Sequence, residues 1–155
     1  IGPYGVNKEG SGDMYYKGGN LLHTIRQLIN DDDKFRKILR DMNHEFKHQS
    51  INSSNVEEYI GNAAKMDLAP VFHQYLWTTQ IPVLEYRIKN NAIEYRWTNC
   101  TEGFNMRVKV SINGQVMWLE PLETWKTHAS TAAAIEKFEV DRNFYINTRQ
   151  AGLFP

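Results

Sequence analysis

Apolar residues recur with a helical period in the first half of the chain and with a period of two in the second half. Between residues 13 and 79 they repeat about every 3.6 positions, as on amphipathic helices. After Pro82 they alternate with polar residues, most clearly from Phe104 to Ile112. We therefore predict an α+β chain, with a helical domain over residues 1–80 and an antiparallel β-sandwich over residues 81–155.

Residues that start and stop helices divide the first half into four segments. Asn30 closes the first helix, and the acids of residues 31–33 open the second near the positive end of its dipole. Ser54 and Glu57 fit a capping box at the start of the third helix. Pro70 is predicted at the first position of the fourth helix.

Short alternating runs predict about seven strands in the second half. The turn Asn113-Gly114 predicts a tight hairpin between two of them. The predicted strands span residues 84–88, 93–97, 104–112, 116–119, 123–126, 137–140 and 144–148.

Charge and cysteine content exclude several classes of protein. The 155 residues carry 18 Lys plus Arg and 18 Asp plus Glu, so the chain lacks the basic excess of a nucleic-acid binder. Cys100 is the single cysteine and forms neither an internal disulfide nor a thiolate zinc site. No apolar run approaches the roughly 20 residues of a transmembrane segment. The first residue is Ile1 rather than Met, and the chain shows no signal-peptide pattern, so we expect a mature or cut piece. The residues do not indicate its compartment.

The string His44-Glu45-Phe46-Lys47-His48 matches H-E-x-x-H, the helical zinc signature. In that signature two histidines bind the metal and the glutamate acts as the general base. Helix geometry argues against a metal site. His44 and His48 fall about half a turn away from the apolar stripe that begins at Phe35. A catalytic metal needs a sheltered site, and Lys47 adds a cation inside the motif. We therefore interpret His44, Glu45 and His48 as a chance match on a solvated helix face.

Tyr16 lies in the first turn of the first predicted helix, opposite the apolar stripe. On pattern alone an outward tyrosine is ordinary surface. A phenol placed near a polarised carbonyl instead donates a hydrogen bond to a developing oxyanion. Spacing does not choose between these alternatives.

Several short strings occur in an order that one enzyme family shares. The stretch from Gly2-Pro3-Tyr4-Gly5 to Tyr15-Tyr16-Lys17-Gly18, and the string at residues 81–86, resemble the aminopeptidase N family of zinc aminopeptidases (gluzincins). In that family a Tyr-Lys-Gly stretch opens a helix late in the thermolysin-like catalytic domain, and the second string resembles the junction into a β-sandwich. The resemblance extends to residues 35–39, 53–60, 71–76, 138–141 and 144–147.

The resemblance implies that the chain is the C-terminal part of an enzyme that removes N-terminal residues from peptides. It would comprise the end of the catalytic domain and an immunoglobulin-like β-sandwich. Tyr16 matches the tyrosine that stabilises the tetrahedral intermediate. The family's zinc motif, third-ligand glutamate and Gly-x-Met-Glu-Asn loop all precede that tyrosine, whereas residues 44–48 follow it. The implied partners are therefore a peptide substrate and the upstream part of the same polypeptide. Zinc would belong to the parent enzyme, and we expect this chain alone to bind none and to be inactive.

A second hypothesis is a non-catalytic helical plus β-sandwich module whose binding surface is the sandwich. Four tryptophans could form a ligand platform, although tryptophans in small sandwiches are more often core or interface residues. We interpret Cys100 as an ordinary thiol rather than a nucleophile. The tryptophans are Trp77, Trp97, Trp118 and Trp125.

Overall fold

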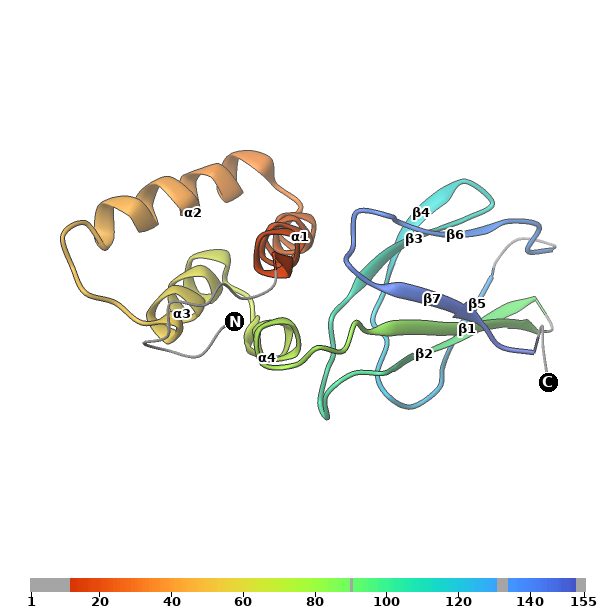
Figure 1. The fold of residues 1–155 in the computed structure, drawn as a ribbon. Coiled ribbons are helices and arrows are strands. Elements are labelled where there is room, and N and C mark those ends of the chain that lie inside the picture. The colour runs from red at the N-terminus through yellow and green to blue at the C-terminus, as the bar shows by residue number, and fades with distance from the viewer. Residues whose placement is uncertain (1–11, 90, 131–133, 153–155) are drawn as a thin grey trace.

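The computed structural model describes residues 12–89, 91–130 and 134–152, in which four helices precede seven strands (Figure 1). This arrangement confirms the predicted α+β class. The helices are α1 (Asp13–Ile29), α2 (Asp32–Glu45), α3 (Ser53–Ala64) and α4 (Ala69–Trp77). The strands are β1 (Val83–Lys89), β2 (Ala92–Thr98), β3 (Val108–Ile112), β4 (Gln115–Leu119), β5 (Lys126–Ala129), β6 (Phe138–Val140) and β7 (Asn147–Gln150). The division into domains 1–80 and 81–155 stays a prediction.

The helix boundaries follow the capping residues with one exception. Asn30 ends α1 in the left-handed conformation, at φ 55°, and the Asp31 side chain accepts a hydrogen bond from the backbone N–H of Lys34 at the start of α2. The capping box predicted for α3 is wrong by two residues. Asn52 and Asn55 form it, each side chain accepting from the other's backbone N–H at 3.0–3.1 Å.

The strands form two sheets, as expected for a sandwich. One sheet has the order β5-β2-β1-β7 and the other β4-β3-β6. All pairs are antiparallel except β1 with β7, which is parallel, so the predicted antiparallel sandwich is confirmed with one parallel pair added. The hairpin prediction is confirmed, because Asn113 and Gly114 both have positive φ between β3 and β4. The fifth strand begins at Lys126, three residues later than predicted.

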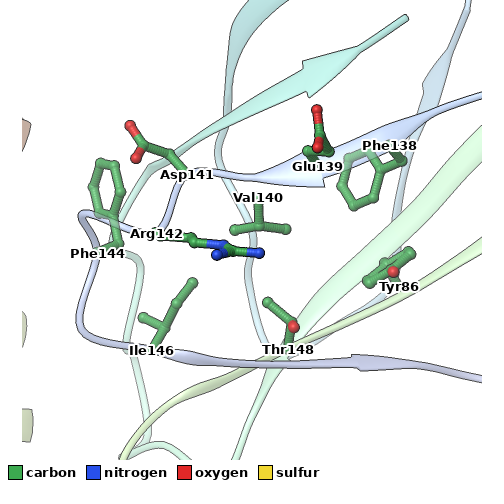
Figure 2. Close-up of a pocket in the computed structure, with 9 residues that line it drawn as sticks. All are labelled: Tyr86, Phe138, Glu139, Val140, Asp141, Arg142, Phe144, Ile146 and Thr148. Carbon is green, nitrogen blue, oxygen red and sulfur yellow. The ribbon is translucent and has the colours of Figure 1, made fainter.

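Strands β6 and β7 are each the last strand of a sheet, and a cavity opens between the two sheets at this side (Figure 2). Its walls come from β1, β6, β7 and the chain that joins the last two strands.

Two predicted strands are shorter than expected because side chains bind their backbone. The strand predicted from Phe104 begins only at Val108, and the Met106 carbonyl accepts a hydrogen bond of 2.9 Å from the Trp97 indole. Phe104 and Met106 are nevertheless buried, so their alternation reports the core correctly. An apolar alternation thus predicts which side faces the core and not which backbone groups pair with a strand.

The last strand is displaced for the same reason. The prediction begins at Phe144, whereas β7 begins at Asn147. The Tyr145 backbone N–H donates to the Thr24 hydroxyl of α1 at 3.0 Å, and the Tyr145 carbonyl accepts from the Tyr75 hydroxyl of α4 at 2.6 Å. Both backbone groups are therefore bound to helix side chains.

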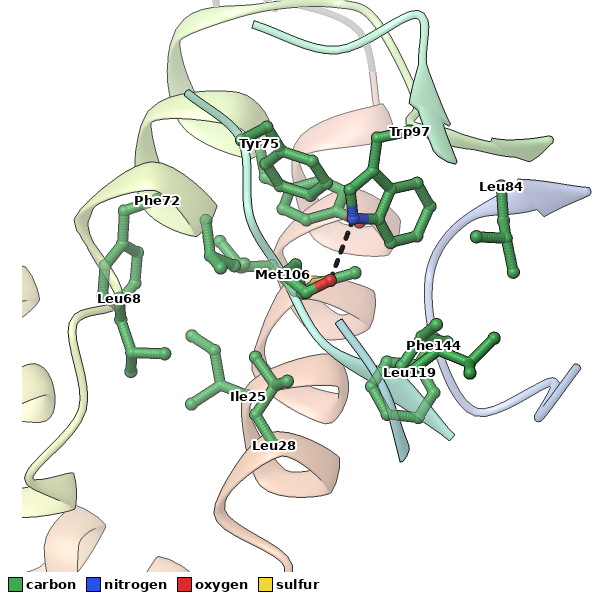
Figure 3. Close-up of a cluster of buried hydrophobic side chains, with 14 of the residues drawn as sticks. Ile25, Leu28, Leu68, Phe72, Tyr75, Leu84, Trp97, Met106, Leu119 and Phe144 are labelled. Carbon is green, nitrogen blue, oxygen red and sulfur yellow. Dashed lines mark hydrogen bonds between the residues drawn. The ribbon is translucent and has the colours of Figure 1, made fainter. Parts of the chain in front are cut away.

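The hydrophobic core continues from the helices into the sandwich. Helices α1 and α4 lie between the other two helices and the sheets in Figure 1, and Figure 3 shows side chains from both parts packed around α1. The buried residues include Leu21, Ile25 and Leu28 of α1, Phe72 and Tyr75 of α4, and Trp97, Met106 and Leu119 of the strand-rich part. The start of α1 is less buried than the stripe predicts, because Met14 and Leu22 are exposed.

Candidate functional site

Tyr16 lies at the exposed N-terminal turn of α1. Its side chain is 77% exposed, and those of Tyr15 and Met14 are also exposed. Gly12 precedes the helix and provides no side-chain cap. The helix therefore begins with three large side chains that contact little of the described structure.

A hydrogen bond connects this turn to the end of α4. The Lys17 ammonium donates to the Thr78 carbonyl, directly after Trp77. Trp77 is 70% exposed, and Leu76 is exposed as well. We call the exposed residues Met14, Tyr15, Tyr16, Leu76 and Trp77, at the two helix ends that this hydrogen bond connects, the aromatic end. Where large apolar side chains are exposed together, the surface is often one that another part of a protein covers.

The Tyr16 hydroxyl has no hydrogen-bond partner among the described residues. A phenol O–H both donates and accepts hydrogen bonds. In this position it is available to a group that approaches from outside the chain. Donation to an oxygen that gains negative charge during peptide hydrolysis is one use of such a group.

The H-E-x-x-H match does not lie on one helix. α2 ends at Glu45, and His48 lies in the following turn with φ 61°. Both His44 and His48 are exposed. The zinc signature requires its two histidines four residues apart on one helical face, and this backbone does not provide that spacing. Within the described ranges, no three His, Cys, Asp or Glu side chains are grouped so that they could hold a metal ion.

The four tryptophans do not form one platform. Trp97 is buried in the core, and Trp118 packs edge-on against Phe144 at 5.9 Å between the ring centroids. Trp125 lies near two guanidinium groups on the sandwich, and Trp77 is at the aromatic end. Cys100 is half-buried, and burial together with the nearby Glu123 charge raises its pKa to about 11. Such a thiol stays protonated near neutral pH and is a poor nucleophile.

The outer face of the four-stranded sheet carries an ion-pair cluster that the sequence analysis did not single out. The buried Glu85 carboxylate accepts from Arg96 at 2.6 Å and pairs with Arg149 at 2.8 Å. Burial alone would raise the pKa of Glu85, but hydrogen bonds and charges from the two arginines outweigh it and lower that pKa. Glu85 of β1 lies directly opposite Arg96 of β2 and Arg149 of β7. The register of the strands brings the three residues together, and no local sequence pattern indicates it.

Comparison with solved structures identifies a similar arrangement of elements. The fold resembles part of an aminopeptidase. One similar protein is aminopeptidase A of Legionella pneumophila, whose crystal structure is a complex with aspartic acid. The TM-score is 0.66 at 12% sequence identity, and the match covers 90% of this chain. This chain spans only 18% of the length of that aminopeptidase.

At this sequence identity, the likeness to the aminopeptidase establishes the fold alone. No family model and no curated protein sequence matches the chain. The structural likeness extends across the helices and the sandwich, since it covers nine-tenths of the residues. No helix within the described ranges combines the length and apolar character needed to cross a membrane.

Proposed function

We propose that this chain is part of a zinc-dependent aminopeptidase that removes N-terminal residues from peptides. The helices would complete its catalytic domain, and the sandwich would be the domain that follows. The observation that carries the proposal is the exposed Tyr16 at the start of a helix, within a fold that resembles a segment of an aminopeptidase. The short sequence strings that resemble the aminopeptidase N family support the same assignment.

The described residues do not fit a zinc site. His48 lies outside α2, and the described part of the chain offers no group of three metal-binding side chains. Structural and catalytic zinc sites in proteins need three or four such ligands. The metal of the proposed enzyme would therefore be held by residues upstream of this chain.

The proposed role of Tyr16 is hydrogen-bond donation to the transition state. When a nucleophile attacks a peptide carbonyl, the carbonyl oxygen gains negative charge. A hydroxyl already in position stabilises this charge without reorganising at the moment of reaction. The exposed position of Tyr16 is compatible with a substrate bound by the upstream part of the polypeptide, which would also cover the aromatic end.

The decisive test is Tyr16→Phe in the polypeptide encoded by the complete reading frame, assayed with an aminoacyl-4-nitroanilide. We expect kcat to fall about 100-fold or more, the loss typical for one oxyanion donor, with an unchanged melting temperature. Tyr15→Phe is the matched control, because it removes a neighbouring exposed hydroxyl and should leave kcat unchanged. A Tyr16→Phe enzyme with normal kcat would remove the assigned role.

The 155-residue chain tests our interpretation of residues 44–48, and the complete polypeptide tests the alternative of a non-catalytic module. Elemental mass spectrometry after dialysis against a mild chelator should find no stoichiometric zinc, and the isolated chain should not release 4-nitroaniline. One zinc per chain that His44→Ala removes would contradict our interpretation of residues 44–48. Absence of any aminopeptidase activity from the complete polypeptide would favour the non-catalytic module.

A further inference from the structure

The cavity at the open side of the sandwich has a volume of about 380 Å³, and most of its accessible lining is polar. This volume lies within the range of small-molecule binding sites, roughly 300–1,000 Å³. Tyr86 and Phe138 form one part of the wall, with ring centroids 4.6 Å apart. Val140, Phe144 and Ile146 extend the lining along β6 and toward β7.

A single guanidinium group lies over this lining. Figure 2 shows the Arg142 side chain reaching across the space between Val140 and Thr148. Arg142 has no ion pair or hydrogen bond to any residue that the structure describes. Its charge is therefore available to an anion in the cavity, and arginine binds carboxylates in a two-pronged geometry.

The two acids of the lining do not neutralise Arg142. Asp141 accepts hydrogen bonds from the backbone and side-chain nitrogens of Asn143, at 3.0 and 2.8 Å. Glu139 pairs with Lys137 at 2.9 Å. In Figure 2 both carboxylates point away from the space into which Arg142 reaches. Arg142 is thus the charged side chain of the lining that faces the cavity.

The edge of β7 adds further hydrogen-bond donors. Thr148 lies opposite Leu84 in the parallel register, which places its hydroxyl on the inner face of the sheet. The N–H groups of Asn147 and Ala151 donate to β1, so the N–H of Thr148 between them points to the free edge. Among the described strands none pairs with that edge. A ligand at Arg142 would therefore also meet edge donors.

We propose that this cavity binds an organic carboxylate. The carboxylate contacts the Arg142 guanidinium and the Thr148 donors, and the rest of the molecule lies beside Phe138, Val140 and Ile146. The C-terminal residue of a peptide and a free medium-chain carboxylic acid share this chemistry. The inference concerns the sandwich alone and does not depend on the aminopeptidase assignment.

The test is an NMR titration of the ¹⁵N-labelled 155-residue chain with N-acetyl-leucine, octanoate and N-acetyl-leucinamide. We expect saturable shifts at Tyr86, Phe138 and Thr148 with at least one of the two acids. The uncharged amide should bind at least about tenfold more weakly, because it lacks the charge that Arg142 recognises. Saturation by N-acetyl-leucine alone assigns the peptide C-terminus, and saturation by octanoate alone assigns a free acid. Absence of saturation with both acids overturns the proposal.

The matched variants are Arg142→Gln and Arg40→Gln. Both remove an exposed arginine, but Arg40 lies on α2, away from the cavity. Arg142→Gln should weaken acid binding at least tenfold while the other resonances stay in place, and Arg40→Gln should leave it unchanged. Thr148→Val removes the hydroxyl at nearly constant shape and should weaken binding a few-fold. Equal affinity of the wild-type chain and Arg142→Gln, or equal affinity for acid and amide, overturns the proposal.

Discussion

The outer face of the four-stranded sheet and the aromatic end differ in how far their surface side chains are paired within the chain. On the outer face of the four-stranded sheet, Glu85 is paired with Arg96 and Arg149, and the Trp125 ring lies 4.5–4.6 Å from two guanidinium groups. At the aromatic end, Tyr16 and Trp77 are 77% and 70% exposed. The sheet surface is thus completed by groups of the same chain, whereas the aromatic end is not. Under the proposed function, the aromatic end rather than the outer sheet face is the surface that adjoins further protein.

The junction between helices and sandwich is closed by buried polar contacts. Gln74 is fully buried; its side-chain oxygen accepts from the Thr101 N–H at 2.6 Å and its amide donates to the Gln80 carbonyl at 2.9 Å. Arg107, in the segment between β2 and β3, donates a hydrogen bond of 2.7 Å to the Leu28 carbonyl of α1. Such contacts stabilise one relative position of the two parts, because misplacement leaves buried polar groups unpaired.

The largest expected effect is that of Trp97→Ala. Trp97 is 1% exposed, its indole donates to Met106, and its ring packs edge-on against Phe104. We expect the free energy of unfolding to fall by about 3–5 kcal/mol, from lost burial, a new cavity and an unpaired carbonyl. Urea denaturation followed by circular dichroism measures this change. A loss below about 1 kcal/mol would show that this core position is wrongly assigned.

Tyr75→Phe should have the next largest effect, because it breaks the junction itself. Burial raises the pKa of Tyr75, so its hydroxyl stays a donor to the Tyr145 carbonyl across the two parts. Its loss should cost about 1–3 kcal/mol by leaving that carbonyl unpaired. Tyr59→Phe is the control, since the Tyr59 hydroxyl has no hydrogen bond to a described residue. Equal urea midpoints for the two variants would contradict a contribution of this bond to stability.

The features that the sequence predicts well are those that depend on neighbouring residues. Helix boundaries depend on neighbouring residues: Asn30 supplies the left-handed end of α1, and Asp31 caps α2. The hairpin at Asn113 and Gly114 likewise depends on local φ preferences. Such features need no knowledge of the rest of the chain, and they are confirmed.

Features that depend on distant partners were missed. The predicted strands at Phe104 and Phe144 begin late because Trp97 and Tyr75 bind the backbone of these segments. The cavity at Arg142 exists because β6 and β7 happen to be sheet edges on the same side, which no local pattern encodes. Tyr16 was singled out only through a family resemblance, because an exposed tyrosine has no distinctive periodicity.

Glu85→Gln tests the paired surface of the sheet through its pH dependence. A carboxyl whose pKa is lowered by folding stabilises the fold above its unfolded pKa of about 4.3, and this contribution is lost as pH falls through the folded value. At pH 7 we expect the variant to be less stable by about 1–2 kcal/mol, with the difference shrinking below about pH 4. Urea titrations at several pH values measure it. Glu58→Gln, at an exposed site on α3, should show no such dependence.

Trp77→Ser should have the smallest effect on stability and therefore sharpens the comparison most. The side chain is 70% exposed, so its removal should change the free energy of unfolding by no more than about 0.5 kcal/mol. If the aromatic end is a surface that further protein covers, it should bind to itself when left bare. Sedimentation velocity should then show concentration-dependent association of the 155-residue chain that Trp77→Ser weakens. A chain that stays monomeric at high concentration would place the aromatic end among ordinary solvated surfaces, like the outer face of the sheet.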